Sequence, residues 1–545
     1  MPNLIDRQTR CLLVQPAFSR NSFWNYRDVC TLVGAKYPAA PLGLLTVGAL
    51  LPQHWQLKLI DENTTSLTND HLDWADIVLT GGMLPQQAAI LNVIERAHGK
   101  GKPVVVGGPD PTSQTPLYTN ADYRVLGEGE VTIPPFIQDL GHNVACGEYL
   151  SSMRADMTIA IVPRFDLIRF ADYMHVGIQF SRGCPYNCEF CDIIELFGRV
   201  PRTKTPQHIV AELDRLYALG YRGHIDFVDD NFIGNKAKVL EVLEAMAHWN
   251  KQHDHPFYFS TEASINLAKE TRLLELMREN DFRYVFVGIE SPDEAVLVQA
   301  HKIQNRNVEV VEAVRTLAEY GMIVNGGFIL GFDNETDKTA NHMVDLIQDT
   351  GICMAMVGTL SALPKTQLSR RLEREGRLFS RAFVIGKSSD IDQTTSGLNF
   401  RTTRSRTAIL QDHADVFRHI YSPKNYYRRI LNTAINLRPN SQNKTSFGQA
   451  FKLFWGFVKL SIKAGMNPRT AFYYWRTLFQ VLIRNPRSVE AAANLAAMYV
   501  HFGKQSDYVV QLIDEKVNEV LQMGEEAYNQ FMIGGRLANE STSPQ

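Results

Sequence analysis

At 545 residues, with 45% apolar and 21% charged residues, the chain has the composition of a globular protein and is longer than one domain of ordinary size, so we expect two to four domains. The first residues have no apolar run with a cleavage pattern, and no stretch of about 18 residues is apolar without a charge, which argues against a secretory signal and a spanning helix. The odd total of seven cysteines argues against a disulfide framework and favours a reducing cytosol.

The formal net charge of −2 is unevenly distributed along the chain. Residues 1–400 hold 37 Lys or Arg against 48 Asp or Glu, whereas residues 401–545 hold 19 against 10. A basic end of this kind can meet phosphate, a membrane surface or the acidic body of the same protein.

Residues 1–150 alternate short apolar runs with helical patterns. Strands are expected at 10–15, 57–61, 75–80, 103–106 and 122–126, and helices at 42–52, 86–98 and 130–139. This alternation predicts a doubly wound parallel sheet that is covered on both faces. The last three strands run into glycines, namely Gly81, Gly82, Gly107, Gly108 and Gly127. These glycines either let the backbone approach a flat ligand or only make tight strand-to-helix turns.

A second α/β series follows a linker at 151–170. Strands are expected at 176–180, 224–228, 257–261, 284–288, 324–330 and 355–358, and helices at 206–219, 236–251, 270–279, 307–320 and 336–350. Six such steps predict a partial (β/α)6 TIM barrel over 171–395, with its site at the carboxyl ends of the strands.

Three cysteines, Cys184, Cys188 and Cys191, stand in a CxxxCxxC spacing directly after the first strand of this series. Soft thiolates favour zinc, copper(I) or iron–sulfur clusters. A structural zinc site wants four ligands, usually in CxxC pairs, and the chain has no second pair. The triplet therefore predicts a [4Fe–4S] cluster held at three corners, with one iron open, against the alternative of a chance group of thiols. The four scattered cysteines are expected to be inert core thiols, namely Cys11, Cys30, Cys146 and Cys353.

This spacing, with Phe190 just before the last cysteine, resembles the signature of the radical S-adenosylmethionine (SAM) enzymes. In that family the open iron chelates SAM, and an electron cleaves the sulfonium to a 5′-deoxyadenosyl radical. The resemblance implies SAM contacts at Phe190 and at the following strand ends, namely Asp229, Asp230, Glu262, Ser264, Glu290, Gly327 and Gly331. Acids at strand ends also cap the next helix, which is the alternative for each of them. The basic run at 199–204 either neutralises a carboxylate or phosphate or is a solvated loop.

The layout of residues 1–150 resembles the cobalamin-binding domains that are fused to radical enzymes. The Asp-x-His-x-x-Gly motif is absent, because no histidine lies between Met1 and His54, so the resemblance implies a cobalamin without a histidine ligand from that motif. The cobalamin contacts that it implies are Thr80, Gly81, Gly82, Met83, Gly107, Gly108, Gly127, Glu128 and Gly129.

Residues 396–545 are expected to form an all-helical domain, with breaks at several prolines. One helical stretch, 451–463, places Lys452, Lys459 and Lys463 on one face and apolar and aromatic residues on the others. That pattern suits either a core helix or a helix lying in a lipid interface.

Together these parts resemble the cobalamin-dependent radical SAM methyltransferases. The runs at 227–236 and 261–264 and the helical C-terminal region are similar to the subfamily that contains hopanoid C-2 methylase. The resemblance implies a cytoplasmic enzyme that methylates an unactivated carbon of a hopanoid or other lipid-like substrate. It implies SAM, cobalamin and a [4Fe–4S] cluster as cofactors, an electron donor such as flavodoxin or ferredoxin, no nucleic acid, and peripheral membrane contact through the basic aromatic C-terminal region.

Two rival functions stay open at this stage. One is a cobalamin radical SAM enzyme that rearranges or cyclises its substrate without methyl transfer, and the other is a sensor that binds cobalamin or SAM without turnover. A methylthiotransferase is disfavoured, because its N-terminal domain needs three cluster cysteines and this one offers only Cys11 and Cys30.

Overall fold

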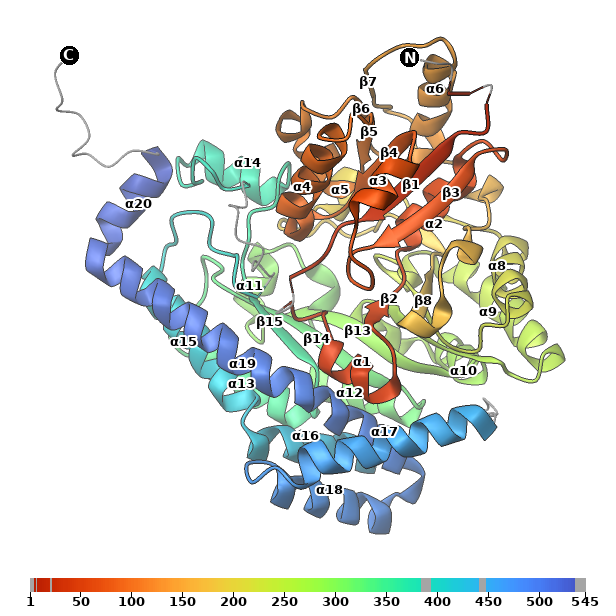
Figure 1. Ribbon diagram of the computed structural model, residues 1–545. Coiled ribbons are helices and arrows are strands. Elements are labelled where there is room, and N and C mark those ends of the chain that lie inside the picture. The colour runs from red at the N-terminus through yellow and green to blue at the C-terminus, as the bar shows by residue number, and fades with distance from the viewer. Residues whose placement is uncertain (1–3, 6, 20–21, 384–393, 441–446, 535–545) are drawn as a thin grey trace.

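The computed structural model describes residues 4–5, 7–19, 22–383, 394–440 and 447–534 of the chain. Figure 1 shows three parts: a first sheet with its helices, a curled sheet with helices on its outer side, and a set of long helices that lines the remaining side. The predicted α/β fold with a helical C-terminal region is confirmed. No helix within these described ranges is both long and apolar enough to cross a membrane.

The first sheet contains six parallel strands in the order β3-β1-β4-β5-β6-β7. Their bounds are β1 (Arg10–Gln15), β3 (Gln56–Asp61), β4 (Ile77–Gly81), β5 (Val104–Gly107), β6 (Tyr123–Val125) and β7 (Gly147–Tyr149). Five of these strands were expected. The short edge strand β7 was not, because its residues carry no apolar run.

Helices cover both faces of this sheet, as the continuous apolar strands require. Along β1, Leu12 and Val14 face one core together with α3 (Asn69–Trp74) and α4 (Gln87–His98). Cys11 and Leu13 face the opposite core, where α6 (Gly129–Gly141) packs and α2 (Leu42–Leu50) adds partly buried side chains. The alternation along one strand thus supplies two separate cores.

The second sheet is the partial barrel, with seven parallel strands in the order β15-β14-β13-β12-β11-β8-β2. Its strands are β2 (Tyr37–Ala39), β8 (Tyr173–Ile178), β11 (Gly223–Phe227), β12 (Phe257–Glu262), β13 (Phe282–Glu290), β14 (Ile323–Leu330) and β15 (Ala355–Thr359). The six expected strands are present. The seventh, β2, comes from the N-terminal region, so that region contributes to both sheets.

Helices follow the barrel strands on the outer side. They are α8 (Pro206–Ala218), α9 (Lys236–Gln252), α10 (Thr271–Glu279), α11 (Glu294–Gln299), α12 (Val310–Glu319) and α13 (Thr339–Thr350). The start of α8 shows how the sequence fixes such a boundary. Thr205 accepts a hydrogen bond from the backbone N–H of His208, and Pro206 occupies the first turn, where it loses no helical hydrogen bond.

The helices after β15 pack partly on the barrel and partly on one another. They are α14 (Gln367–Arg374), α15 (Arg406–Ile420), α16 (Pro423–Asn436), α17 (Phe447–Gly465), α18 (Ala471–Arg484), α19 (Val489–Met523) and α20 (Glu525–Gly534). The long helix α19 runs along α15 and α16, and Phe502 on α19 stacks near Phe23 of the N-terminal segment at 4.8 Å between ring centroids. The helical part therefore holds the N-terminal segment against the barrel.

Candidate active site

The cysteine loop lies between β9 (Ser181–Arg182) and α7 (Ile193–Leu196), at the carboxyl end of the barrel. Cys188 is buried, and Cys184 and Cys191 are half-buried. Burial raises the pKa of the Cys184 and Cys191 thiols, and the neighbouring Cys188 raises both pKa values further. The Cys188 thiol therefore lies near both of the other two.

Two amides face the cysteine sulfurs. The Asn231 side chain donates to the Cys184 Sγ at 3.9 Å, and the Gln304 side chain donates to the Cys188 Sγ at 3.6 Å. The Gln304 Oε1 is buried and finds no partner among the described residues. Amide donors aimed at sulfur suit thiolates that carry a cluster, because hydrogen bonds to sulfur stabilise negative charge there.

The donor set fits a four-iron cluster better than a single ion. No three His, Cys, Asp or Glu side chains in the described part of the chain converge on one metal position. A [4Fe–4S] cluster does not need such a point, since each cysteine binds its own iron. Of the remaining cysteines, Cys11, Cys30 and Cys353 are buried elsewhere, whereas Cys146 is exposed, so its assignment as a core thiol was wrong.

Asp229 and Asp230 hold the start of the cysteine loop. Asp229 is buried and accepts hydrogen bonds from the backbone N–H of Phe180 at 3.0 Å and from the Ser181 hydroxyl at 2.5 Å. Asp230 accepts from the backbone N–H of Gly183 at 3.0 Å. Burial raises their pKa values to about 7 and about 6. Both carboxylates therefore fix the backbone that leads into Cys184.

The end of β12 brings Glu262 and Ser264 beside the loop. The Glu262 side chain is exposed, yet desolvation, with the charge of Asp226 added, raises its pKa to about 8. Glu262 is thus an accessible carboxyl at the carboxyl end of β12, in the electrostatic field of Asp226, Asp229 and Asp230. Ser264 donates to Asn266, whose amide donates to the hydroxyl of Tyr186 in the cysteine loop at 2.9 Å.

Glu290 at the end of β13 is paired with a lysine that the sequence did not single out. The Lys302 Nζ lies 2.6 Å from the Glu290 Oε1, and both side chains are almost buried. Although burial opposes it, Glu290 and the Cys188 and Cys191 thiols raise the pKa of Lys302, so this cation adjoins the cysteines. Its only sequence signal was a lone lysine after an apolar helical stretch. Glu290 itself has φ +67°, a left-handed conformation rare for glutamate.

Gly327 lies within β14, Gly331 directly follows the strand, and the strand end meets Phe190. A Cβ on Gly327 would lie 2.9 Å from the Phe286 ring, and Gly331 has φ +106°. Phe190 packs edge-on against Phe332 with 5.9 Å between ring centroids. The loop residue and the strand end thus lie side by side, with Lys302 Nζ 6.0 Å above the Phe190 ring.

The glycines at the edge of the first sheet have a packing role of their own. A Cβ on Gly81 would lie 2.1 Å from the carbonyl oxygen of Gly107, and one on Gly107 would lie 2.6 Å from that of Val125. Thr80 is buried and donates to the carbonyl of Val14 at 3.0 Å, whereas Met83 is exposed. Gly82 and Gly108 also approach each other closely, with a Gly108 Cβ 3.0 Å from the Gly82 nitrogen.

Glu128 joins the edge of the first sheet to the cysteine loop. Its buried carboxylate accepts two hydrogen bonds from Arg202 at 2.8 Å each and one from Arg182 at 3.1 Å. Arg182 also binds Glu130 at 2.7 Å. The basic run at 199–204 was expected either to neutralise a carboxylate or phosphate or to form a solvated loop. Arg202 in this run neutralises a carboxylate, that of Glu128 in the same chain. Flanked by Gly127 and Gly129, Glu128 directly follows the expected glycine turn.

A second contact joins the same two edges. The Lys365 Nζ, after β15, donates to the carbonyl of Thr112, after β5, at 2.9 Å. Because both partners follow the carboxyl ends of their strands, the carboxyl edges of the two sheets face each other. The residues expected to contact cobalamin and those expected to contact SAM therefore lie on opposite sides of one interface.

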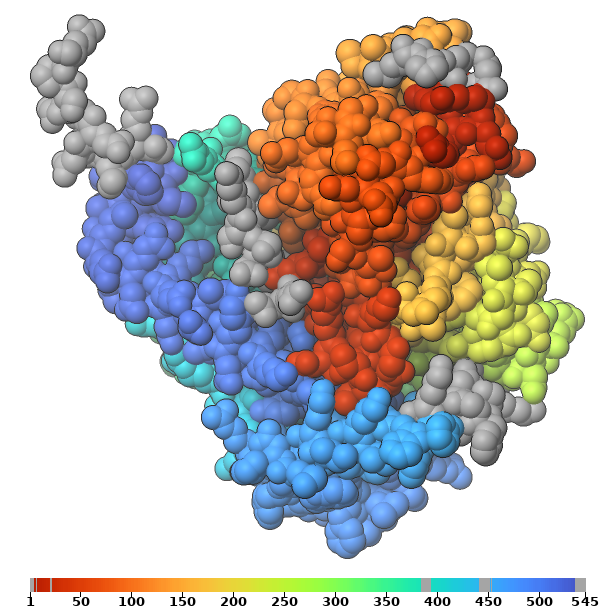
Figure 2. Space-filling model, in the orientation of Figure 1, coloured from red at the N-terminus to blue at the C-terminus, as the bar shows by residue number. Residues whose placement is uncertain are grey.

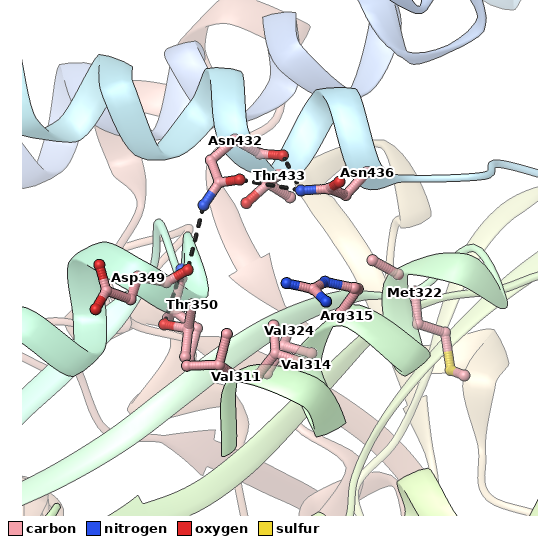
Figure 3. A pocket seen from close by; sticks show the side chains of 12 residues that line it. Val311, Val314, Arg315, Met322, Val324, Asp349, Thr350, Asn432, Thr433 and Asn436 are labelled. Carbon is pink, nitrogen blue, oxygen red and sulfur yellow. Dashed lines mark hydrogen bonds between the residues drawn. The ribbon is translucent and has the colours of Figure 1, made fainter. Parts of the chain in front are cut away.

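A separate small pocket lies on the outer side of the barrel, where α12 and α13 approach α16 (Figure 3). Arg315, Asp349 and Asn432 are among the side chains that line it. None of the cysteines or strand-end residues named above lines this pocket, so it is not part of the candidate site.

Comparison with protein families gives two matches. The model of the radical SAM superfamily matches residues 178–347, which span the cysteine loop and most of the barrel strands. Residues 366–515 match a domain of unknown function (DUF4070).

Two curated relatives are similar over most of their length. An uncharacterized methyltransferase from Synechocystis sp. is 38% identical over 515 residues, which cover 94% of this chain and 95% of the relative. The hopanoid C-2 methylase of Rhodopseudomonas palustris is 40% identical over 376 residues, which cover 68% of this chain and 71% of the relative.

Two solved structures share the fold. OxsB, a cobalamin-dependent SAM radical enzyme with aqua-cobalamin and SAM bound, has a TM-score of 0.58 at 15% identity, covering 98% of this chain and 85% of OxsB. TsrM from Kitasatospora setae, a radical SAM methyltransferase with cobalamin and a [4Fe–4S] cluster bound, has a TM-score of 0.55 at 16% identity, covering 68% and 78%.

We expect Cys184→Ala, Cys188→Ala and Cys191→Ala each to lose the cluster, because each thiolate would hold one iron. After anaerobic reconstitution with iron and sulfide, the parent should bind about four irons per chain and each variant close to none. Cys146→Ala, at the exposed cysteine, is the control and should bind iron like the parent. Full iron content in any of the three variants would contradict the assignment.

We expect Glu128→Ala to lower the free energy of unfolding by about 3 kcal/mol, because it leaves Arg202 without its buried carboxylate. Glu148→Ala, which breaks the more exposed pair with Arg124, should cost less than about 1 kcal/mol. Urea unfolding of both variants measures the difference. Equal losses would show that the Glu128 network does not hold the two sheets together.

Proposed function

This chain belongs to the cobalamin-dependent radical SAM methyltransferases, and from that premise we propose that it transfers a methyl group to an unactivated carbon of a lipid-like substrate. The observation that carries the proposal is the meeting of two carboxyl edges at Glu128. One edge belongs to a doubly wound sheet and the other holds the cysteine loop. A carbon bound between them is within reach of groups held by both.

The residues of the loop fit their proposed roles. Cys184, Cys188 and Cys191 would hold the [4Fe–4S] cluster, which with SAM supplies a radical that removes hydrogen from carbon. Asp229 fixes the backbone before the loop. Lys302, held by Glu290 and buried beside the thiols, is suited to neutralise an anionic group such as the carboxylate of SAM.

The barrel strand ends provide the remaining proposed SAM contacts. Glu262 is accessible at the carboxyl end of β12, and a carboxylate there can accept hydrogen bonds from ribose hydroxyls. Phe190 packs on Phe332, which directly follows Gly331 at the end of β14. A Cβ on Gly331 would meet the Leu398 side chain, so a SAM contact at Gly331 would be made by its backbone.

The edge of the first sheet is the proposed cobalamin surface. Gly82, Met83 and Gly108 lie at that edge, and Met83 is exposed there. The buried Thr80 and the tightly packed Gly81 and Gly107 would support this surface rather than touch the ligand. Glu128 would serve by holding the surface against the cysteine loop.

The substrate and partners follow from likeness to the hopanoid C-2 methylase. We assign a hopanoid, or another apolar polycyclic lipid, as the substrate class. A low-potential electron donor such as flavodoxin or ferredoxin is part of the proposal, because the cluster must be reduced for each radical. Peripheral contact of the C-terminal region with the inner face of the membrane is part of it too.

One incubation separates this function from its rivals. The protein is reconstituted anaerobically with iron, sulfide and cobalamin, reduced, and given SAM with a deuterated methyl group and lipids from a hopanoid-making host. We expect 5′-deoxyadenosine and a hopanoid heavier by one labelled methyl, by mass spectrometry. The Cys188→Ala variant is the control and should form neither.

Other outcomes of the incubation overturn defined parts of the proposal. Label in a different lipid would contradict the hopanoid substrate alone. Formation of 5′-deoxyadenosine with an altered but unlabelled lipid would contradict methyl transfer and favour rearrangement or cyclisation. Absence of 5′-deoxyadenosine in protein that holds its full cluster would favour the sensor.

A further inference from the structure

The exposed apolar side chains of this protein are concentrated on two neighbouring helices. Every Phe and Trp that is exposed in the described part of the chain lies on α17 or α18. They are Phe451, Phe454, Trp455, Phe457, Phe472, Trp475 and Phe479, and exposed aliphatic side chains join them at Leu453, Ile462, Met466, Leu482 and Ile483. Soluble proteins seldom leave so many large apolar groups together on one surface without a partner.

The inner faces of the two helices are already occupied. On α17, Leu460 and Ala464 are buried, and Gly456 lies against the backbone of Leu32 in α1 (Arg27–Val33). On α18, Tyr474 and Val481 are buried. Each helix therefore has one apolar face that packs inward and a second apolar face that is left exposed.

The exposed faces follow the helical repeat. On α18, Phe472, Trp475, Phe479 and Ile483 are spaced by three or four residues and lie on one side of the helix. The Trp475 ring packs on Gly465 at the end of α17, and its Nε1 donates to the Gly465 carbonyl at 3.0 Å. The two helices lie together at the lower end of the molecule in Figures 1 and 2, so their outer faces share one end of the surface.

The charge along this part of the chain has a single sign. From Val416 to Val489 the sequence has 13 Lys or Arg and no Asp or Glu. Six of these cations are exposed on or beside the two helices, namely Lys459, Lys463, Arg469, Arg476, Arg484 and Arg487. Aromatic and aliphatic side chains interleaved with cations are the composition of a helix that lies in a membrane interface, where the rings enter the acyl boundary and the cations meet anionic head groups.

The charge also disfavours a second copy of the chain as the occupant. A face-to-face pair would bring six exposed cations from each copy together with no acid from this region to offset them. A bilayer with anionic lipids supplies the missing negative charge. It also covers the two apolar faces at once.

We propose that α17 and α18 form a docking surface for a bilayer that contains anionic lipid. The inference deepens the partner part of the proposed function. It does not depend on the chemistry at the cysteine loop. The stretch 451–463 was expected to be either a core helix or a helix in a lipid interface. Under this proposal α17 is both, because one side packs in the core and the other side lies in the interface.

The test is flotation of the full-length protein with vesicles. We expect binding to phosphatidylcholine vesicles that contain phosphatidylglycerol, weaker binding to pure phosphatidylcholine, and a decrease at high salt. Phe479→Asp combined with Ile483→Asp should weaken binding by about tenfold or more, because it places charges in the apolar face. Lys459→Glu combined with Lys463→Glu should weaken binding to the anionic vesicles selectively.

Leu521→Asp is the matched control, since Leu521 is similarly exposed but lies on α19, outside α17 and α18. It should bind like the parent, and circular dichroism should show that all variants are folded. Folded parent that does not float with anionic vesicles, or an apolar-face variant that floats like the parent, would overturn the proposal. A dimer in lipid-free solution that dissociates in the Phe479→Asp variant would also overturn the proposal, because a second copy of the chain would then cover the apolar faces.

This result is separable from the proposed chemistry. An α17 or α18 variant that has lost vesicle binding should still form 5′-deoxyadenosine from SAM after reconstitution. Loss of 5′-deoxyadenosine in the parent would count against the radical chemistry and leave the vesicle result standing.

Discussion

The buried carboxylate of Glu128, shared by Arg182 and Arg202, is the interaction on which the arrangement of this protein depends. Removing three charges from water carries a large cost, which only close and complementary geometry offsets. Here Arg202 binds both carboxylate oxygens at 2.8 Å, and Arg182 is shared with Glu130. Glu128 stands at the start of α6, after β6 of the first sheet, whereas Arg182 and Arg202 face each other on the paired strands β9 and β10 (Arg202–Thr203) beside the cysteine loop. Satisfying the charges therefore ties the edge of the first sheet to the cysteine loop.

This connection decides which surfaces can act together. Arg182 precedes Cys184 by two residues, and Glu128 follows β6, so the ion pairs border the cysteine loop on one side and the glycine edge on the other. Asp229 and Asp230 accept hydrogen bonds from the backbone that leads into the loop. Lys302 and Gln304, which follow β13 in the chain, lie beside the thiols. Contacts from Asp229, Asp230, Lys302 and Gln304 thus hold the cysteine loop in place, which is the pre-organisation that a radical site requires.

Much of this fold could be predicted from sequence, for physical reasons that differ by element. Apolar runs that end in glycine predicted buried strands, and the cysteine spacing predicted where a cluster could form. The strand β2 was missed because three residues with a proline carry no periodic signal.

The pairing of Glu128 with Arg182 and Arg202 joins residues 54 and 74 positions apart, and no local pattern reports such a contact. Lys302 escaped notice for the same reason. The sequence of α17 suited either a core helix or a helix in a lipid interface, and the packing of Gly456 on α1 shows which side of it is buried.

The central claim is that the two sheets share one active site, with the cluster held by the barrel and cobalamin held by the edge of the first sheet. Anomalous diffraction from crystals of the reconstituted protein, recorded at the iron and cobalt edges, tests it most directly. The account predicts an iron peak at Cys184, Cys188 and Cys191 and a cobalt peak beside Gly82, Met83 and Gly108, both bordering the space closed by Glu128. A cobalt peak elsewhere, or an iron peak away from the three cysteines, would contradict it.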